Sequence, residues 1–216
     1  AQTLVPYVSV VPNLVGVPMS NAELESFFDT HIMVLNIKNN LAFQTNQIIK
    51  RIFDIVCTVC GGILISPLLL AVFVWVKLDS PGPAIYKQRR VGKDGKEFDC
   101  YKFRSMVVDS KERLEKLLAT DPKAKEEWER DFKLKNDPRI TKSGAFLRKT
   151  SLDELPQLLN VLKGEMSLVG PRPIVQKEVP RYEQYIKEYY MVLPGITGLW
   201  QVSGRSDTTY PERVAM

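Results

Sequence analysis

The sequence predicts an α+β chain that is mostly helical and associated with a membrane. Three observations lead to this fold class. Residues 55–76 carry no charged side chain and are long enough to reach deep into a bilayer as a helix. Residues 84–106 read as two strands joined by an Asp-Gly turn, which predicts a small β-hairpin. Residues 108–135 repeat apolar side chains at helical intervals, which predicts amphipathic helices.

The composition fits one globular domain with an attached segment. The 216 residues are 44% hydrophobic and 25% charged, which is enough for one sizeable core. Thirty Lys and Arg against 25 Asp and Glu give a net charge of +5. A basic chain favours an anionic partner, which is a nucleic acid, a phosphorylated substrate or an acidic membrane surface. Charge alone does not choose among these.

The cysteines and the single histidine favour structural roles. Cys57, Cys60 and Cys100 are too few for a disulfide framework, and with His31 they make no zinc pattern. Cys57 and Cys60 have a redox spacing, but a thiolate is costly in an apolar run, so small buried side chains are expected. Three unpaired cysteines fit a reducing location that faces the cytosol.

Residues 1–47 are expected to be the end of an upstream domain with its linker. The segment PYVSVVPNLVGVPMS alternates like a strand but is broken by prolines, and these residues hold too few apolar positions for a core of their own. The chain is therefore expected to be a fragment, in which residues 48–80 form the membrane helix and residues 81–216 form a cytosolic domain.

The uncharged run is interrupted at its centre. Pro67 removes one helical hydrogen bond and follows Ser66, so a sharp bend is expected at this pair. Each arm would be about eleven residues, or ~16 Å, which is half the depth of the hydrocarbon layer. Basic residues flank both ends, which suits a segment that returns to its own face. A kinked transmembrane helix remains the alternative, because membrane helices tolerate proline.

The predicted hairpin is strongly basic. Seven cations lie between Lys87 and Arg104, against three anions. Such a hairpin is either a wall that faces phosphate groups or a solvated edge protected by charge, and the residues do not decide between these readings.

Two amphipathic helices are expected within residues 108–135, divided at Asp121-Pro122. Trp128 and Phe132 lie one turn apart among lysines, which suits either a helix on lipid headgroups or packing on the domain core. The same two readings apply to a stripe of aromatic and apolar side chains further along, formed by Tyr182, Tyr185, Ile186, Tyr189 and Tyr190.

Three arginines stand in stiff or turn-like settings that suit phosphate binding. Arg172 lies between two prolines in VGPRP, Arg205 ends GLWQVSGR, and Arg148 lies five residues before Asp153. Restricted backbone freedom leaves less entropy to lose when a guanidinium grips a phosphate. A surface arginine in a structural turn is the alternative for each. No P-loop or GxGxxG pattern supports nucleotide binding of the common kinds.

The segment KTSLDELPQ, residues 149–157, sets two acids side by side. Ser151-x-x-Glu154 fits a capping box, while the other reading is that a carboxylate attacks phosphorus or holds a metal. Pro156 bears on this choice, because a helix beginning at Ser151 would place proline five positions inside. A start at Asp153 or Glu154 is expected instead, which puts both carboxylates at the beginning of the helix.

Many ordered motifs resemble those of the bacterial sugar transferases, the monotopic polyprenyl-phosphate hexose-1-phosphate transferases. The resemblance begins near Lys50 and runs to the end of the chain. The motifs that carry it are KRIFDIV, the Ser66-Pro67 break, YKQRRVGKDGKEF, YKFRSM, NDPRITKSGAFLRKTSLDELPQLLNVLKGEMSLVGPRP and PGITGLWQVSGR. The stretch from Ala124 and the last motif look most like the larger members of the family.

The resemblance implies a reaction, a cofactor and a topology. A UDP-sugar, with galactose expected first and glucose next, would give its hexose 1-phosphate to undecaprenyl phosphate and release UMP at the cytoplasmic face of a bacterial inner membrane. It also implies Mg²⁺, a re-entrant helix and a homodimer. Asp153 would be the nucleophile and would form a covalent phospho-sugar intermediate. Glu154, with Asp153, would hold the metal.

Cations would offset the repulsion between two anionic substrates in such a reaction. The expected phosphate ligands are Lys87, Arg90, Arg104, Arg148, Arg172 and Arg205.

The sequence departs from the family pattern at both ends. Larger members carry an upstream membrane bundle and a regulatory domain, and the catalytic domain of residues 81–216 stops before the usual C-terminal segment. Among other classes, a non-catalytic basic scaffold at the membrane surface would explain the charge but not the paired acids. A nucleic-acid binder fits the uncharged run poorly, so no nucleic acid is expected as a partner.

Overall fold

The computed structural model describes residues 22–27, 32–37, 43–131, 134, 137–202 and 214. The chain divides into two compact units, Ala1–Ile49 and Lys50–Val214. In the first unit, β1 (Ala22–Phe27) pairs with β2 (Ile32–Ile37) in an antiparallel hairpin that the sequence analysis did not predict. The strand-like segment of residues 6–20 and His31 lie outside the described residues.

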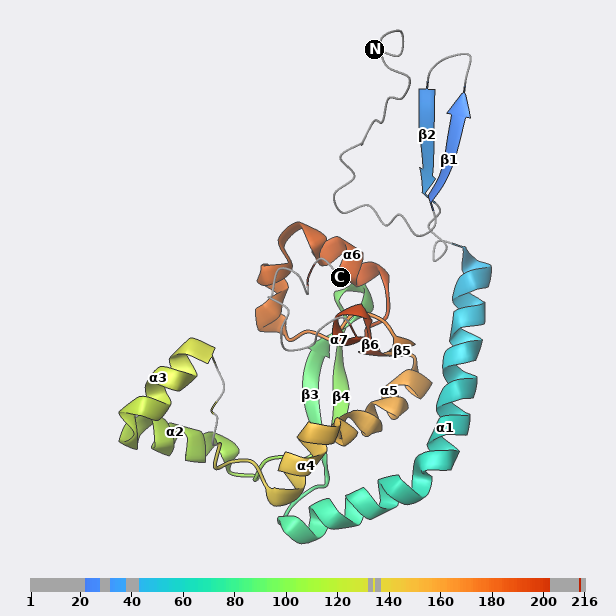
Figure 1. Ribbon diagram of the computed structural model, residues 1–216. Coiled ribbons are helices and arrows are strands. Elements are labelled where there is room, and N and C mark those ends of the chain that lie inside the picture. The colour runs from blue at the N-terminus through green and yellow to red at the C-terminus, as the bar shows by residue number, and fades with distance from the viewer. Residues whose placement is uncertain are drawn as a thin grey trace, which may run out of the picture. The chain divides into compact units, whose positions relative to one another are not determined.

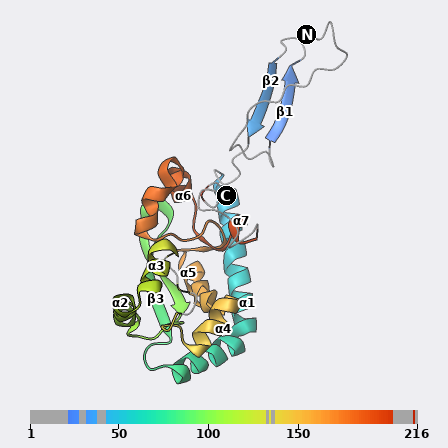
Figure 2. The same ribbon diagram turned by 60° about the vertical axis from the view of Figure 1, so that its left-hand side comes forward.

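The second unit confirms the α+β class, mostly helical with small sheets (Figures 1 and 2). Its elements in chain order are α1 (Gln44–Asp79, which begins in the first unit), β3 (Ile85–Val91), η3 (Lys93–Gly95), β4 (Glu97–Phe103), α2 (Ser110–Thr120), α3 (Pro122–Asp131), α4 (Lys142–Thr150), η4 (Leu152–Gln157), α5 (Leu158–Lys163), β5 (Ser167–Val169), η5 (Gln176–Tyr185), α6 (Ile186–Met191), β6 (Gly195–Thr197) and α7 (Leu199–Val202).

The predicted hairpin is confirmed as β3 and β4, paired from Ile85↔Phe103 to Val91↔Glu97. Asp94 and Gly95 both adopt positive φ, and the Lys96 N–H donates to the Lys93 carbonyl, so the Asp-Gly turn forms as expected. The helices α2 and α3 are also confirmed, and Asp121 separates them. Its carboxylate accepts from the backbone N–H groups of Lys123 and Ala124 in the first turn of α3. N–H groups in the first turn of a helix have no carbonyl partner inside the helix.

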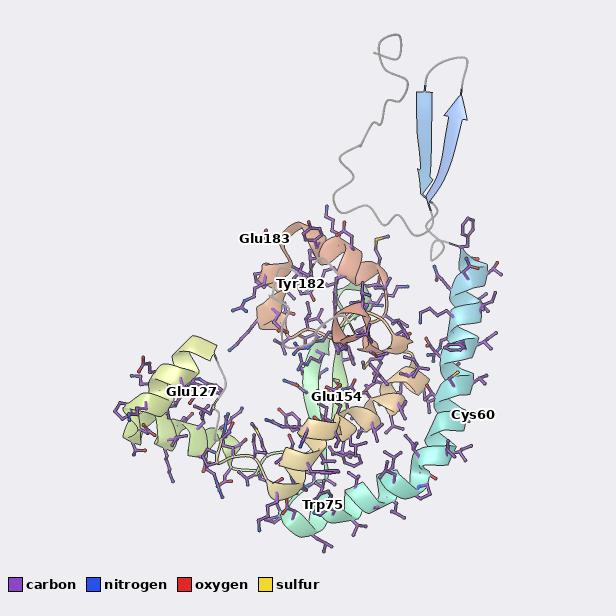
Figure 3. All side chains as sticks on the ribbon, viewed as in Figure 1. Cys60, Trp75, Glu127, Glu154, Tyr182 and Glu183 are labelled. Atoms are coloured by element: carbon purple, nitrogen blue, oxygen red, sulfur yellow. The ribbon has the colours of Figure 1, made fainter. Side chains whose placement is uncertain are left out.

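Helix α1 is a single 36-residue helix, long and apolar enough to cross a membrane by length and composition. Figure 1 shows that it changes direction, and Figure 3 places the bend between Cys60 and Trp75. Pro67 has no N–H for the carbonyl of Ile63, and the hydroxyl of Ser66 donates to that carbonyl at 2.8 Å. The Ser66-Pro67 pair therefore bends the helix and satisfies the oxygen that the proline frees.

Both ends of the apolar part of α1 are bonded to the second unit. Near the first end, Arg51 donates to the carbonyls of Val161 and Leu162 at the end of α5. At the other end, the carboxylate of Asp79 accepts from the backbone N–H and the hydroxyl of Ser143 at the start of α4. Most apolar side chains between these anchors are exposed.

Cys57 and Cys60 are exposed on α1, so the expectation that protein atoms would bury them is wrong. Cys100 is buried in the core of the second unit.

Three apolar clusters hold the second unit together. The first joins α1 to the hairpin and α4 through Val72, Val76, Phe103 and Leu147. The second joins the hairpin to α5 through Phe98, Cys100, Val161 and Met166. The third contains Tyr189 with Tyr182, Ile186 and Tyr190 packed around it, so these members of the aromatic stripe belong to the core.

Candidate functional site

Asp153 and Glu154 lie in the first turn of η4, directly after α4. Ser151 ends α4 with a left-handed backbone (φ 59°), and its carbonyl accepts from the Glu154 N–H at 3.2 Å. The serine side chain makes no cap, so the capping-box reading is wrong. The expected start at the two acids is nearly right, but the helix is a 3₁₀ turn beginning at Leu152, and the α-helical part starts only at Leu158.

Glu154 is paired with a lysine that the sequence analysis missed. Lys102 of β4 donates from Nζ to Glu154 Oε1 at 2.6 Å, and both side chains are only partly exposed. In the sequence, Lys102 is one of seven hairpin cations with nothing to distinguish it. Strand alternation places Lys102 and Tyr101 on opposite faces, but only the packing of η4 beside β4 shows which face meets the acids.

Asp153 is half-buried, and the loss of water around its carboxyl raises its pKa. The positive charge of Lys102 opposes that rise, the negative charge of Glu154 adds to it, and Arg148 lowers it again. Arg148 is held by its Nε, which donates to Ser105 Oγ at 2.9 Å. The structure thus brings together two acids and two cations from β4, α4 and η4.

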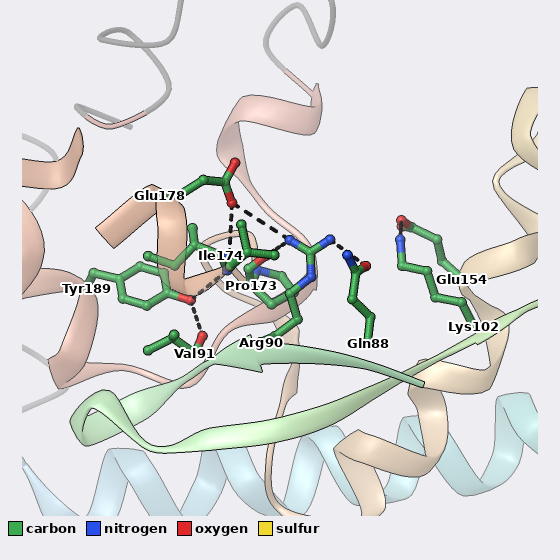
Figure 4. Close-up of polar contacts among 10 residues, drawn as sticks. Gln88, Arg90, Val91, Lys102, Glu154, Pro173, Ile174, Glu178 and Tyr189 are labelled. Carbon is green, nitrogen blue, oxygen red and sulfur yellow. Dashed lines mark hydrogen bonds and ion pairs between the residues drawn. The ribbon is translucent and has the colours of Figure 1, made fainter. Parts of the chain in front are cut away.

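Arg90 is placed inside the protein, and its expected phosphate contact stays a prediction. Its side chain donates to the carbonyl of Pro173 at 3.0 Å and to Gln88 Oε1 at 2.8 Å, and it lies 3.8 Å from Glu178 (Figure 4). Only 8% of the residue is exposed, and burial lowers the pKa of the guanidinium. Arg90 therefore links β3 to the segment Pro171-Arg172-Pro173.

Arg104 is also structural. Its guanidinium donates to the carbonyl of Ser80 at 2.6 Å and to the Ser80 hydroxyl at 2.9 Å, at the end of α1. With 6% of the residue exposed, it holds the carbonyl end of a helix, where a cation is favoured. These contacts use only Nη2, and the buried Nε and Nη1 of Arg104 have no partner among the described residues, so its expected phosphate contact stays a prediction.

Lys87 points away from the acids. In the hairpin register it is opposite Tyr101, so these two side chains project from one face of the hairpin. Lys102 projects from the other face. Its ammonium lies 5.7 Å from the centre of the Tyr101 ring. Gln88, Arg90 and Lys102 rise together from the other face in Figure 4.

Arg172 lies half-buried between Pro171 and Pro173, close enough to Arg90 for its charge to lower the pKa of Arg90. Arg172 and Arg148 both remain candidate phosphate ligands. Arg205 lies outside the described residues.

The two acids fit a magnesium site that is completed by a substrate. In the part of the chain that the structure describes, no group of three His, Cys, Asp or Glu side chains could hold a metal by itself. Mg²⁺ in phosphate-transferring sites is commonly bound by one or two carboxylates together with substrate phosphates and water. The oxygen donors of Asp153 and Glu154 match that set.

A family model described as bacterial sugar transferase matches residues 45–216. The chain is 57% identical over 208 residues to an undecaprenyl-phosphate galactose phosphotransferase of Salmonella typhimurium, covering 96% of this chain and 43% of that protein. It is 53% identical over 207 residues to a UDP-galactose-lipid carrier transferase of Erwinia amylovora, covering 96% and 43%.

A third relative carries a different sugar in its name. The UDP-glucose:undecaprenyl-phosphate glucose-1-phosphate transferase of Escherichia coli is 44% identical over 173 residues, covering 78% of this chain and 34% of that protein. The chain spans less than half the length of these three relatives.

Proposed function

The chain belongs to the bacterial sugar transferase family, and we propose that it transfers a hexose 1-phosphate from a UDP-sugar to undecaprenyl phosphate with release of UMP. The product would be the first lipid-linked sugar of a surface polysaccharide. The observation that carries the proposal is the grouping of Asp153, Glu154, Lys102 and Arg148, in which a half-buried carboxylate stands beside cations. This is the arrangement that attack on an anionic phosphorus requires.

Two displacements at phosphorus account for the reaction. A carboxylate oxygen of Asp153 attacks the phosphorus next to the sugar, the bond to the bridging oxygen breaks, and UMP leaves with the electron pair. A phosphate oxygen of undecaprenyl phosphate then attacks the same phosphorus and releases Asp153 as the carboxylate. Covalent catalysis divides one difficult transfer between two bulky anions into two easier steps.

The chain's own cations and acids have separate tasks in this scheme. Lys102 and Arg148 offset the charge of the donor and hold Asp153 ionised against its burial. Glu154, with Asp153, would hold Mg²⁺, which supplies charge neutralisation at the phosphates when bound. Arg172 would grip a phosphate from the stiff PRP segment.

Galactose is the proposed sugar, because two relatives with galactose in their names match 96% of the chain at 57% and 53% identity. Glucose is the second candidate, since the relative with glucose in its name is 44% identical.

Purified protein with undecaprenyl phosphate, Mg²⁺ and a panel of UDP-sugars tests both the reaction and the sugar. UMP release that needs all three components supports the proposal. A non-catalytic scaffold would release none. The proposed homodimer is tested on the same sample by light scattering.

We also propose that α1 enters and leaves the bilayer on the cytoplasmic face of the inner membrane. The bend at Ser66-Pro67 supports this topology, and so do the anchors at Arg51 and Asp79. Because both anchors bond to the same compact unit, both ends of the apolar part stay on that unit's side. A lipid-linked phosphate at the headgroup level would then meet the site without leaving the membrane.

The double variant Ser66→Ala, Pro67→Leu is expected to straighten α1 into a membrane-crossing helix. Single cysteines introduced as Gln47→Cys and Pro83→Cys, in a background without native cysteines, report the side of each end to a water-soluble thiol reagent in sealed vesicles. The parent should show both ends on one side and the double variant should show them on opposite sides. Both ends on one side in the double variant would mean that the bend does not set the topology.

The variant Lys102→Met is expected to move the acid limb of the pH profile of kcat/KM to higher pH. Asp153 attacks only when ionised, so activity is lost as the pH falls through its pKa. Burial already raises this pKa and Lys102 lowers it, so removal of the lysine raises it further. The rate at the optimum should also fall about a hundredfold, as for loss of one charge-stabilising donor.

The control for this measurement is Lys123→Met on α3, an exposed lysine with the same change of charge. It should leave both the acid limb and the rate unchanged. An acid limb that stays in place in Lys102→Met would show that the titrating group is not Asp153.

A further inference from the structure

The face of the β3–β4 hairpin that turns away from the acids carries a basic and aromatic cluster that the proposed reaction does not use. Lys87 lies over the Tyr101 ring at 5.7 Å from its centre. Lys163 of α5 lies 4.5 Å from the same centre and donates to the Tyr101 hydroxyl. Two ammonium groups are therefore held within about 10 Å of each other around one tyrosine.

Among the residues that the structure describes, the neighbouring acids are bonded to other partners. Asp99 lies 3.3 Å from Arg89, and Glu165 accepts from the amide of Asn160 at 2.7 Å. Both lysine side chains are exposed. We call the surface formed by Lys87, Tyr101, Lys163, Leu159 and Leu162 the basic face.

Exposed apolar side chains accompany Lys163 on α5. Leu159 and Leu162 on the outer side of α5 are 53% and 42% exposed. On the hairpin, Ile85 and Phe103 leave the same face as Lys87 and Tyr101, and they pack on Val72 and Val76 of α1. Exposed apolar side chains on α1 itself include those of Ile52, Val56, Ile63, Leu64 and Leu70.

The two anchors of α1 lie at either end of this surface. Arg51 bonds to the carbonyls of Val161 and Leu162, next to Lys163 in the chain. The packing of Phe103 on Val76 joins the far end of α1 to the hairpin. If α1 lies in a bilayer, the face of the unit that is bonded to it at both ends must meet the membrane surface.

We propose that the basic face is a docking surface for the headgroups of anionic phospholipids in the bilayer that holds α1. Lys87 and Lys163 would contact lipid phosphates, Tyr101 would lie at the headgroup level, and the two leucines would enter the acyl boundary. The occupant is the bilayer surface, because the cationic groups are continuous with exposed apolar side chains, whereas a soluble anion would need no apolar surround. The inference rests on the proposed placement of α1 but not on the proposed chemistry.

The contact should also orient the unit. A helix held in a membrane leaves the attached unit free to tilt, while a second contact at the headgroups fixes the side that faces the lipid. Because η4 and α5 are consecutive in the chain, a fixed tilt would hold Asp153 at one height relative to the headgroups.

Lysine acetylation of the full chain in lipid nanodiscs tests the proposal. The protein is placed in discs of phosphatidylcholine alone and in discs that also contain phosphatidylglycerol. Each disc is treated with a water-soluble acetylating reagent, and the modification of every lysine is followed by mass spectrometry. Modification of Lys87 and Lys163 should be about fivefold slower in the anionic discs, as expected for one lysine at an anionic surface. High salt should remove the difference.

Lys177 and Lys187, exposed on η5 and α6, are the matched controls for the general effect of an anionic surface on amines. Their rates should change much less than those of Lys87 and Lys163. Equal changes in all four lysines, or equal protection in neutral and anionic discs, would overturn the headgroup contact. Protection that requires added undecaprenyl phosphate would assign the lysines to the substrate instead, and would also overturn it.

Cys57 and Cys60 separate a failure of this inference from a failure of the membrane placement. Both are exposed on α1, so a water-soluble thiol reagent should modify them in detergent-free discs only if α1 is in water. Modified cysteines would reject the placement of α1 and the docking surface together. Protected cysteines with unprotected lysines would reject the docking surface alone. UMP release by the same sample reports separately on the chemistry.

Discussion

Replacing Asp153 by Asn is expected to lower the rate of UMP release at least about a thousandfold, because the amide cannot form the acyl-phosphate bond. The protein should still fold. Burial raises the pKa of Asp153, which means that its ionised form is disfavoured where it stands. A neutral amide of the same shape removes that cost, so the unfolding temperature should stay the same or rise. Kinetics and thermal unfolding of one preparation measure both effects.

The intermediate gives a second readout of the same variant. Incubation of the parent protein with the UDP-sugar, without undecaprenyl phosphate, should add the mass of one hexose phosphate to the peptide that contains Asp153. Asp153→Asn should not gain this mass. Glu154→Gln is the matched control: it removes the partner of Lys102 but keeps the nucleophile, so it should slow the reaction and still allow the adduct. An active Asp153→Asn protein would exclude the covalent mechanism.

Replacing Gly144 by Ala is expected to lower the stability of the second unit by about 3 kcal/mol or more. A Cβ at this position of α4 would lie 2.0 Å from the backbone oxygen of Ser105 and 2.6 Å from its carbonyl carbon. Backbone atoms cannot turn aside as a long side chain can, so α4 and the segment after β4 must separate. The change should show as an unfolding temperature lower by about 10 °C, since each kcal/mol shifts a domain of this size by ~2–4 °C.

The same separation should reach the candidate site, because Ser105 holds Arg148 and η4 follows α4 directly. Activity should therefore fall even at temperatures where Gly144→Ala remains folded. Gly62→Ala on α1 is the matched control, since no atom outside its own stretch of helix backbone lies within 4 Å of its added Cβ. It should keep its activity and gain up to about 1 kcal/mol of helix stability. Equal unfolding temperatures for Gly144→Ala and the parent would contradict the close approach.

The candidate site was only partly predictable from the residues. Asp153 and Glu154 stood out because two acids precede Pro156, and the structure places them at the start of a helical turn. Lys102 did not stand out, because its partner lies 52 positions away in the chain. Arg90 and Arg104 stood out as cations of the hairpin, and the structure gives both of them contacts with protein carbonyls. A buried arginine that bonds to carbonyls looks the same in a sequence as one that binds phosphate, and only its contacts separate the two.

The elements of the second unit were easier to predict than their contacts. Asp94-Gly95 and Asp121-Pro122 mark a turn and a helix boundary through local backbone preferences, and both form as expected. The β1–β2 hairpin was missed, since its second strand, IMVLNI, is a short apolar run whose periodicity does not separate a strand from a helical segment. The aromatic stripe around Tyr189 was left open between lipid and core, and packing on Val91 and Ile174 decided for the core.

The sequence by itself determined the features that depend on neighbours along the chain. These are the apolar helix with its proline bend, the Asp-Gly hairpin, the amphipathic helices and the adjacent acids, because length, hydrophobicity and backbone preference act over a few residues. Only the tertiary structure decided which cations meet those acids. A strand points successive side chains to opposite faces, and the packing of η4 on one side of β4 gave Lys102 to Glu154 and left Lys87 beside Tyr101 on the side of α1.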